Sequence, residues 1–172
     1  SDDTFTFDTS ESLTADDTID GNAGTDTIFV INDDQRAGVS GYGVGNDTAA
    51  TFGANVTNVE KLVLVDGATD NSAGDVSVTI ASGFTAAAFE IDGSELDKNV
   101  TTSDGERLTV DNNAGATLVS LTVKGGEFSD NISSGAGADI LDGGTGNDVI
   151  TGGTGADTID VGTGVDTVIY SS

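Results

Sequence analysis

The 172-residue sequence predicts an all-β chain that winds into a parallel β-solenoid, and three observations lead to this fold class. Nine-residue units follow one another through residues 125–172. Short segments that alternate polar with apolar residues recur between residues 32 and 124, and Val, Ile and Thr are frequent in them. No stretch of the chain sustains the apolar spacing of an amphipathic helix.

The strands of the middle segment fit either a sandwich of two sheets or further coils of one solenoid. Coils are favoured because a continuous stack leaves fewer strand edges exposed. We therefore expect a single solenoid domain over residues 1–172. It has degenerate repeats in residues 1–31, longer strand-rich coils in residues 32–124 and regular repeats in residues 125–172.

Each regular unit has an Asp at its sixth place and an aliphatic residue two positions later. The Asp residues are Asp130, Asp139, Asp148, Asp157 and Asp166. The aliphatic residues are Ile132, Leu141, Ile150, Ile159 and Val168. Small residues, mostly Gly, fill the turn before each Asp. A flexible acidic linker would not keep this spacing through five consecutive units, so we expect folded turns.

The remaining strand and repeat signals are weaker. Asp17 and Asp26 occupy the sixth place of two early units, on opposite sides of the stack, and a partial match near Asp47 would point Ala49 inward. We expect residues 41–47 to form a plain loop and Glu60 to be a solvated residue at a strand start. Expected middle strands cover residues 60–65, 75–81, 86–92, 106–111 and 117–124.

Composition restricts the ligands of this chain. It has 30 acidic and 5 basic residues and a net charge of −25, so nucleic acid and anionic lipid are not expected partners. Cys and His are absent, which removes the usual zinc, iron and copper sites. Carboxylate and carbonyl oxygens remain, and these suit Ca²⁺. No apolar stretch reaches the length of a membrane span.

The regular units resemble the GGxGxDxUx nonapeptide of RTX proteins. The resemblance implies a right-handed β-roll in which two units complete a coil of about 18 residues. It also implies that Ca²⁺ binds between stacked turns. The ligands are the carbonyls of the first and third places of one turn, the carbonyls of the second and fourth places of the turn 18 residues later, and the Asp of each turn. The sequence predicts about two to four Ca²⁺ ions.

The resemblance implies three ligand sets. The first is Ser134, Ala136, Asp139, Gly153, Gly155 and Asp157. The second is Gly143, Thr145, Asp148, Gly162, Gly164 and Asp166. The third is Gly125, Glu127, Asp130, Gly144, Gly146 and Asp148. Phe128 replaces a Gly of the family pattern and argues against the third set, which would make Asp148 serve two ions. Asp17 and Asp26 are candidates either for further ions or for ordinary turn caps.

Catalysis is not expected. Trp is absent and the chain has two tyrosines, so neither an aromatic setting for a general acid nor a sugar-stacking platform is indicated. Thr145, Thr154 and Thr163 share one place of the repeat, and such threonines could order water as in an ice-binding RTX segment. Thr145 and Thr163 share one side and Thr154 lies on the other, so each row of threonines is too short for this.

The mixture of repeats with the phrase over residues 56–64 resembles modules of bacterial RTX surface proteins, such as surface-layer proteins and large adhesins. This resemblance implies a secreted, cell-surface protein that is exported by type I secretion and folded outside by Ca²⁺. Its expected partners are neighbouring modules of a tandem array. The alternative is a recognition module for a glycan, a cell surface or ice.

Overall fold

The computed structural model describes residues 1–7, 13–32, 48–66, 75–96, 107–112 and 120–170. These residues form strands, bridges and turns, without a helix. The first sheet, sheet A, contains β1 (Thr4–Phe7), β3 (Thr27–Asn32), β6 (Lys61–Asp66), β8 (Ala88–Glu95), β10 (Ser120–Lys124), β12 (Ile140–Asp142) and β14 (Thr158–Asp160), in that order. The second, sheet B, contains β4 (Thr48–Phe52), β7 (Val76–Ile80), β9 (Leu108–Asp111), β11 (Asn131–Ser133), β13 (Val149–Gly153) and β15 (Thr167–Tyr170).

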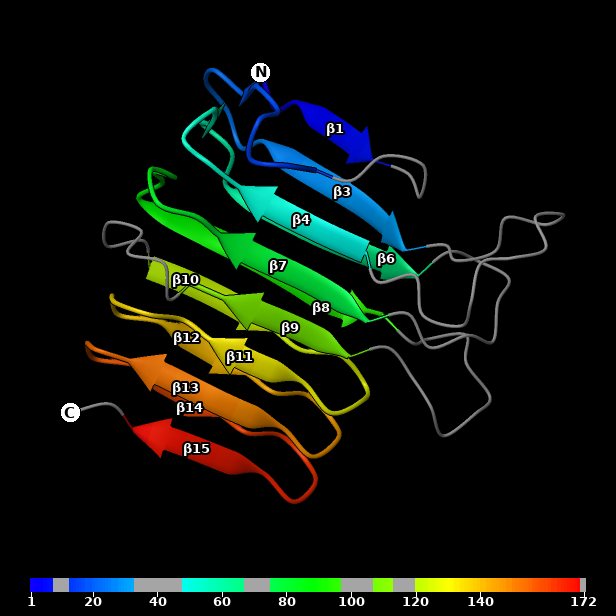
Figure 1. Cartoon of the computed structure of the whole chain (residues 1–172), viewed down its shortest axis with the longest axis vertical. Coiled ribbons are helices and arrows are strands. Elements are labelled where there is room, and N and C mark those ends of the chain that lie inside the picture. The colour runs from blue at the N-terminus through cyan, green and yellow to red at the C-terminus, as the bar shows by residue number, and fades with distance from the viewer. Residues whose placement is uncertain (8–12, 33–47, 67–74, 97–106, 113–119, 171–172) are drawn as a thin grey trace, which may run out of the picture.

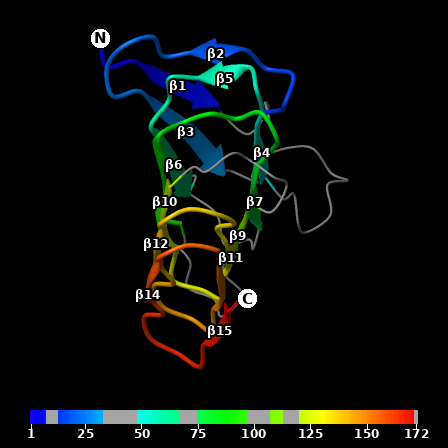
Figure 2. The ribbon, with the colours of Figure 1, turned by 90° about the vertical axis from the view of Figure 1, so that its left-hand side faces the viewer.

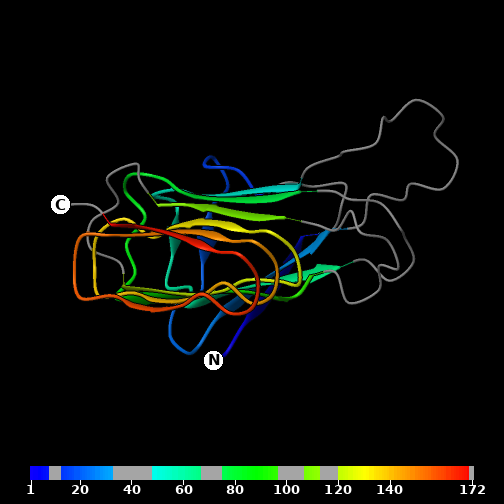
Figure 3. The same ribbon diagram turned by 90° about the horizontal axis from the view of Figure 1, so that it is seen from below.

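From β6 onward the chain alternates between the two sheets, so that each coil adds one strand to each. Every pairing within a sheet is parallel, and the two sheets run in opposite directions (Figure 1). Viewed from below, the last coils are flattened loops with a sheet along each long side (Figure 3). The predicted parallel solenoid is therefore confirmed, whereas its right-handedness stays a prediction.

Coil length changes along the stack. In the last coils stacked residues are 18 positions apart, as for Asp130 and Asp148. In the middle they are 29 apart at Lys61 and Glu90, and 34 apart at Asp26 and Glu60. The expected longer coils of the middle segment are present, and they continue the same two sheets rather than forming a separate sandwich.

The early coils have a third, short side. There β2 (Ile19–Asp20) pairs with β5 (Val56–Thr57), and a bridge joins Thr57 to Thr85 in the next coil. Figure 2 shows β2 and β5 crossing between the two sheet walls at the N-terminal end. This side was not predicted, because a strand of two residues is too short to show an alternating pattern.

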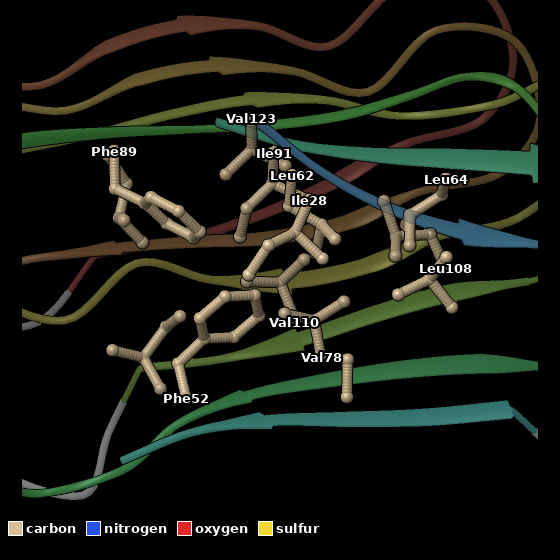
Figure 4. Close-up of a cluster of buried hydrophobic side chains, with 14 of the residues drawn as sticks. Ile28, Phe52, Leu62, Leu64, Val78, Phe89, Ile91, Leu108, Val110 and Val123 are labelled. Atoms are coloured by element: carbon tan, nitrogen blue, oxygen red, sulfur yellow. The ribbon is translucent and has the colours of Figure 1, made fainter. Parts of the chain in front are cut away.

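The core is a set of aliphatic and phenylalanine side chains stacked coil upon coil between the sheets (Figure 4). In sheet A the stack runs through Ile28, Leu62, Ile91, Val123, Leu141 and Ile159. In sheet B it runs through Ala50, Val78, Val110, Ile132, Ile150 and Val168. The aliphatic residues of the regular repeats thus join the same stack as those of the middle segment.

Most strands lie where the sequence predicts them, but β4 was not expected. Residues 41–47 lie outside the described residues. Ala49 is exposed and Ala50 is buried, so the prediction that Ala49 points inward is wrong by one position. The register is set by the pairing of Ala50 with Val78 and by its bridge to Leu13. These are long-range contacts, which the local pattern of two adjacent alanines does not specify.

The outer face of sheet A carries a ladder of charges. Lys61 Nζ lies 2.9 Å from Asp92 Oδ2, and Lys124 Nζ lies 2.7 Å from Glu90 Oε1. Burial raises the pKa of Asp92, but hydrogen bonds from Ser94 and Lys61 outweigh it and hold the pKa at about 2. These ion pairs connect the neighbouring strands β6, β8 and β10 on the surface of the sheet.

Candidate metal sites

The sixth place of the repeat forms one column on each side of the stack, and we call these the place-six columns. The register places Asp26, Glu60, Phe89, Leu121, Asp139 and Asp157 above one another along sheet A. It places Val76, Leu108, Asp130, Asp148 and Asp166 in the column of sheet B. Carboxylates therefore occupy the repeat coils and, at Glu60, the coil that follows the first repeats, whereas buried apolar side chains occupy the same position from β7 to β10.

Each repeat carboxylate is hydrogen-bonded to the coil before it. The Asp157 Oδ1 atom accepts the N–H of Asp139 at 3.1 Å, and the Asp139 Oδ1 atom accepts the N–H of Leu121 at 2.8 Å. On the other side, the oxygens of Asp166, Asp148 and Asp130 accept the N–H groups of Asp148, Asp130 and Leu108 at 2.8–3.0 Å. One oxygen of each carboxylate is thereby fixed.

The second oxygen of two of these carboxylates has no donor. Asp139 and Asp148 are 1 % exposed, and the Oδ2 atom of each is buried without a hydrogen-bond partner. Burial raises the pKa of both carboxyl groups, and hydrogen bonds from the backbone of Leu121 and Asp130 oppose this only in part. A buried, half-satisfied carboxylate is costly unless a cation lies beside it, so these oxygens fit a metal.

The turns approach one another so closely that only Gly fits. Gly153 and Gly155 have φ values of 78° and 141°. A Cβ atom on them would lie 1.7 Å from the Gly135 carbonyl oxygen and 1.5 Å from that of Gly137. Gly162 and Gly164 repeat this geometry one half-coil later. Bare backbone at these places is what allows the peptide groups of neighbouring turns to approach this closely.

The backbone hydrogen bonds between stacked turns do not use the carbonyls that the resemblance assigns as ligands. Thr154 N–H donates to Gly135 at 2.8 Å, and Gly137 N–H donates to Thr154 at 3.0 Å. These two acceptors are not among the carbonyls that the resemblance assigns to the first site. Gly144 and Thr163 serve the second pair of turns in the same way. The second ligand set therefore fits Ca²⁺ with two carboxylates and four carbonyls that these inter-turn bonds do not use. The first set fits in the same way at Ala136, Gly153 and Gly155, whereas its Ser134 carbonyl also accepts the side-chain amide of Asn112.

The third ligand set has a different geometry. Its Glu127 carbonyl accepts the Thr145 hydroxyl at 2.7 Å, and its Asp130 Oδ2 atom accepts the N–H of Gly126 at 2.8 Å. Gly126 and Phe128 do not take the positive φ values found at the corresponding glycines of the later turns. Two of the oxygens that this site would need are thus engaged, in a turn where Phe128 stands at the place of a left-handed Gly.

The two early candidates differ in their surroundings. Asp17 Oδ2 accepts the N–H and the hydroxyl of Thr14 at 2.7 and 3.0 Å, which matches the turn-cap interpretation. Asp26 is 0 % exposed and its Oδ2 atom is buried without a partner, as in Asp139 and Asp148. Asp26 directly precedes β3 of sheet A, whereas Asp17 precedes β2 on the short third side, so the two residues do not lie on the two opposite sheets.

Three neighbours of these sites were not anticipated from the sequence. The Asn112 side-chain amide donates to the Ser134 carbonyl, and the Ser134 hydroxyl donates to Gly152 at 2.8 Å. Glu60 is half-buried, and its Oε2 atom accepts the N–H of Asp26 at 2.8 Å, so it is not the freely solvated residue expected at this strand start. The long coil spacing of 34 residues hid this last contact.

No group of three or more acidic side chains that could hold a metal exists in the described part of the chain. The two C-terminal sites contain two carboxylates each, so backbone carbonyls must supply the other ligands. A family model for the RTX calcium-binding nonapeptide repeat matches residues 6–30, 122–150 and 133–168.

The chain carries RTX calcium-binding nonapeptide repeats at both ends. These matches support Ca²⁺-binding repeats in the matched residues, which make up fewer than half of the chain. RTX repeats are typical of secreted bacterial proteins. Searches of curated proteins and of solved structures gave no match to the chain. A helix long and apolar enough to cross a membrane is not found in the described ranges.

Proposed function

We propose that this RTX module is a Ca²⁺-rigidified structural block of an extracellular bacterial surface protein, of the surface-layer or adhesin type. The observation that carries the proposal is the composition of the place-six columns. Repeat carboxylates occupy both ends of the stack, and buried apolar residues such as Phe89 and Leu121 occupy its middle. Ca²⁺ between the turns stabilises the end coils, whereas the central coils are held by apolar packing that needs no ion.

An extracellular site of action is supported by the ligand set. Two carboxylates and neutral carbonyls give a weaker site than one with four or five charged ligands, and extracellular Ca²⁺ modules have Kd values of about 10⁻⁴–10⁻³ M. Such a site stays empty at cytosolic Ca²⁺ concentrations and fills outside the cell. This behaviour suits export of an unfolded chain by type I secretion, followed by folding at the cell surface.

Calcium titration tests this proposal. Calorimetry and circular dichroism should show Ca²⁺ binding in the range of about 10⁻⁴–10⁻³ M, together with a gain of β-structure. Mg²⁺ should not substitute, because it demands smaller octahedral geometry and dehydrates reluctantly. A Kd in the nanomolar range would contradict an extracellular folding switch, since the module would then load before export.

Neighbouring modules are the proposed partners, and the last coil supports this. Tyr170 and Ile169 are 84 % and 47 % exposed, and with Ile159 they line a hollow at the open end of the stack. The β14 and β15 strands are sheet edges with unpaired backbone groups. Sedimentation velocity in Ca²⁺ should show end-to-end association that Ile169→Lys reduces. A strict monomer at high concentration would argue against stacking of this kind.

A recognition role is a second candidate, favoured by the outer face of sheet B. Its outward positions include Ser77, Thr79, Thr109 and Thr151, which contrast with the charged ladder on sheet A. Small hydroxyl groups on a regular face suit a neutral glycan. A glycan-binding assay tests this role. If the wild type binds a neutral glycan, and Thr79→Lys and Thr151→Lys abolish this binding without changing Ca²⁺ affinity, the recognition role is favoured.

A further inference from the structure

The turn formed by residues 21–26 is a repeat turn whose neighbour in the stack is not a repeat. Asn22 and Gly24 have φ values of 65° and 152°, at the places where the C-terminal turns have their left-handed glycines. The family match ends at residue 30, and the next coil presents Thr57, Asn58, Val59 and Glu60 instead of a six-residue turn. The register places Glu60 directly beyond Asp26 in the place-six column.

Two acceptor oxygens converge beside Gly21. A Cβ atom on Gly21 would lie 2.6 Å from Asp26 Oδ2 and 2.0 Å from the Asn58 carbonyl oxygen. Asp26 Oδ2 is buried and receives no hydrogen bond, while the other oxygen of this carboxylate accepts the N–H of Asp3 at 2.6 Å. Two acceptors at one point without a donor repel each other, unless a cation lies between them.

The second repeat site shows the same convergence. A Cβ atom on Gly143 would lie 2.6 Å from Asp148 Oδ2 and 2.7 Å from the Val161 carbonyl oxygen. Gly125 of the third ligand set also lies beside two such oxygens, but there Asp130 Oδ2 accepts the N–H of Gly126, whereas Asp148 Oδ2, like Asp26 Oδ2, has no donor. Asp166, one coil further, accepts the N–H of Asp148 at 3.0 Å. Gly21, Asp26, Asn58 and Glu60 therefore take the positions of Gly143, Asp148, Val161 and Asp166. Their Glu60–Asp26 hydrogen bond of 2.8 Å completes the equivalence.

Charge supports a cation here. Asp26 and Glu60 bring two carboxylates to the junction of these turns. The side-chain ion pairs recorded for the described residues lie on the outer face of sheet A, where Lys61 bonds Glu90 and Asp92 rather than Glu60. The N-terminal ammonium bonds the Ala23 carbonyl at 2.6 Å, so Ala23 is not counted among the ligands.

We propose that a Ca²⁺ ion binds between the turn of residues 21–26 and residues 58–60. Its protein ligands are Asp26 Oδ2, the Asn58 carbonyl oxygen and the Glu60 carboxylate, and water completes the oxygen shell. The site is a hybrid of one repeat turn and one turn of the middle segment. It rests on the Ca²⁺-dependent function proposed above and extends it, because it ties the first repeat coil to the central coils.

The test compares two charge-matched variants of the full chain. Glu60→Gln keeps an oxygen that accepts the N–H of Asp26 but removes the negative charge. Glu90→Gln removes the same charge from the outer face of sheet A, where Glu90 pairs with Lys124. Native mass spectrometry and calorimetry with CaCl₂ count the ions. We expect Glu60→Gln to weaken one binding event about tenfold or more, and Glu90→Gln to leave all events unchanged.

Hydrogen exchange provides a second readout. Ca²⁺ should slow amide exchange in residues 21–31 of the wild type and of Glu90→Gln, but not of Glu60→Gln. Asp157→Asn serves as a positive control that removes a C-terminal ion. Unchanged binding in Glu60→Gln beside a lost ion in Asp157→Asn would overturn this site alone. A wild type that binds no Ca²⁺ would overturn both this site and the proposed function.

Discussion

Removal of Ca²⁺ should unfold the C-terminal repeat coils while the central coils stay folded. Neighbouring carboxylates of a place-six column are one strand spacing apart, about 4.8 Å. At an effective dielectric constant near 20 each pair repels by about 3 kcal/mol. The repeats contain three such pairs, Asp139–Asp157, Asp130–Asp148 and Asp148–Asp166. Their gross repulsion, on the order of 10 kcal/mol, equals the stability of a typical domain.

The central coils lack this repulsion. Phe89, Leu121 and Leu108 fill the same column positions, and burial of each side chain contributes about 1.5–3 kcal/mol. Phe89 also packs edge-on against Phe52 and Phe84, with ring centroids 4.9 and 5.0 Å apart. These contributions do not depend on an ion, so the coils from β6 to β9 should keep their hydrogen bonds in EGTA.

Hydrogen exchange resolved by mass spectrometry measures this difference. In EGTA, residues 125–170 should exchange rapidly while the strands β6 to β9 stay protected. Ca²⁺ at a hundredfold excess over Kd should restore about 2.7 kcal/mol per bound ion, and Mg²⁺ should not. Equal protection of the two regions in EGTA, or their simultaneous loss in one step, would refute the argument from the place-six columns.

Three further perturbations test separate parts of the structure. Asp148→Asn should release one Ca²⁺ ion in native mass spectrometry, because the Glu127 carbonyl of the third ligand set is already hydrogen-bonded; loss of two ions would contradict this. Gly155→Ala places a Cβ atom against the Gly137 carbonyl and should lower the melting temperature by about 5 °C or more, whereas Thr154→Ala at the exposed neighbouring position should change it little. Asp92 has a pKa below its ordinary 3.8, so it stabilises the fold above about pH 4 and loses this effect as the pH falls toward about 2. Asp92→Asn should therefore cost about 1 kcal/mol at pH 5 and almost nothing near pH 2; a constant difference in urea unfolding would exclude the ion-pair explanation.

The repeat pattern predicts the C-terminal repeats, residues 125–172, well because there each specifying contact is one 18-residue coil away. An 18-residue coil brings Asp139 to Asp157 and Leu141 to Ile159 without any other information. The pattern could also predict that Phe128 disturbs its turn, since a Cβ atom is incompatible with the close approach of these backbones.

The N-terminal half was less predictable, because its register depends on contacts across long connections. Leu13 pairs with Ala50 and Ile19 with Val56, and no repeat of fixed length relates the members of either pair. Glu60 was misinterpreted for the same reason. The sequence around it reads as a strand start, and only the stacking of coils shows that its carboxylate faces Asp26, 34 residues earlier.

The place-six columns also indicate an order of assembly. A solenoid coil has little stability alone and needs a formed neighbour on which to stack. The central coils form such a neighbour without Ca²⁺, and they offer Leu108 and Leu121 N–H groups to the first repeat carboxylates, Asp130 and Asp139. The C-terminal repeats can therefore add coil by coil as ions bind, in the direction from β10 to β15. Because the packed centre fixes the first turns, each later site closes on a surface that the previous coil has already ordered.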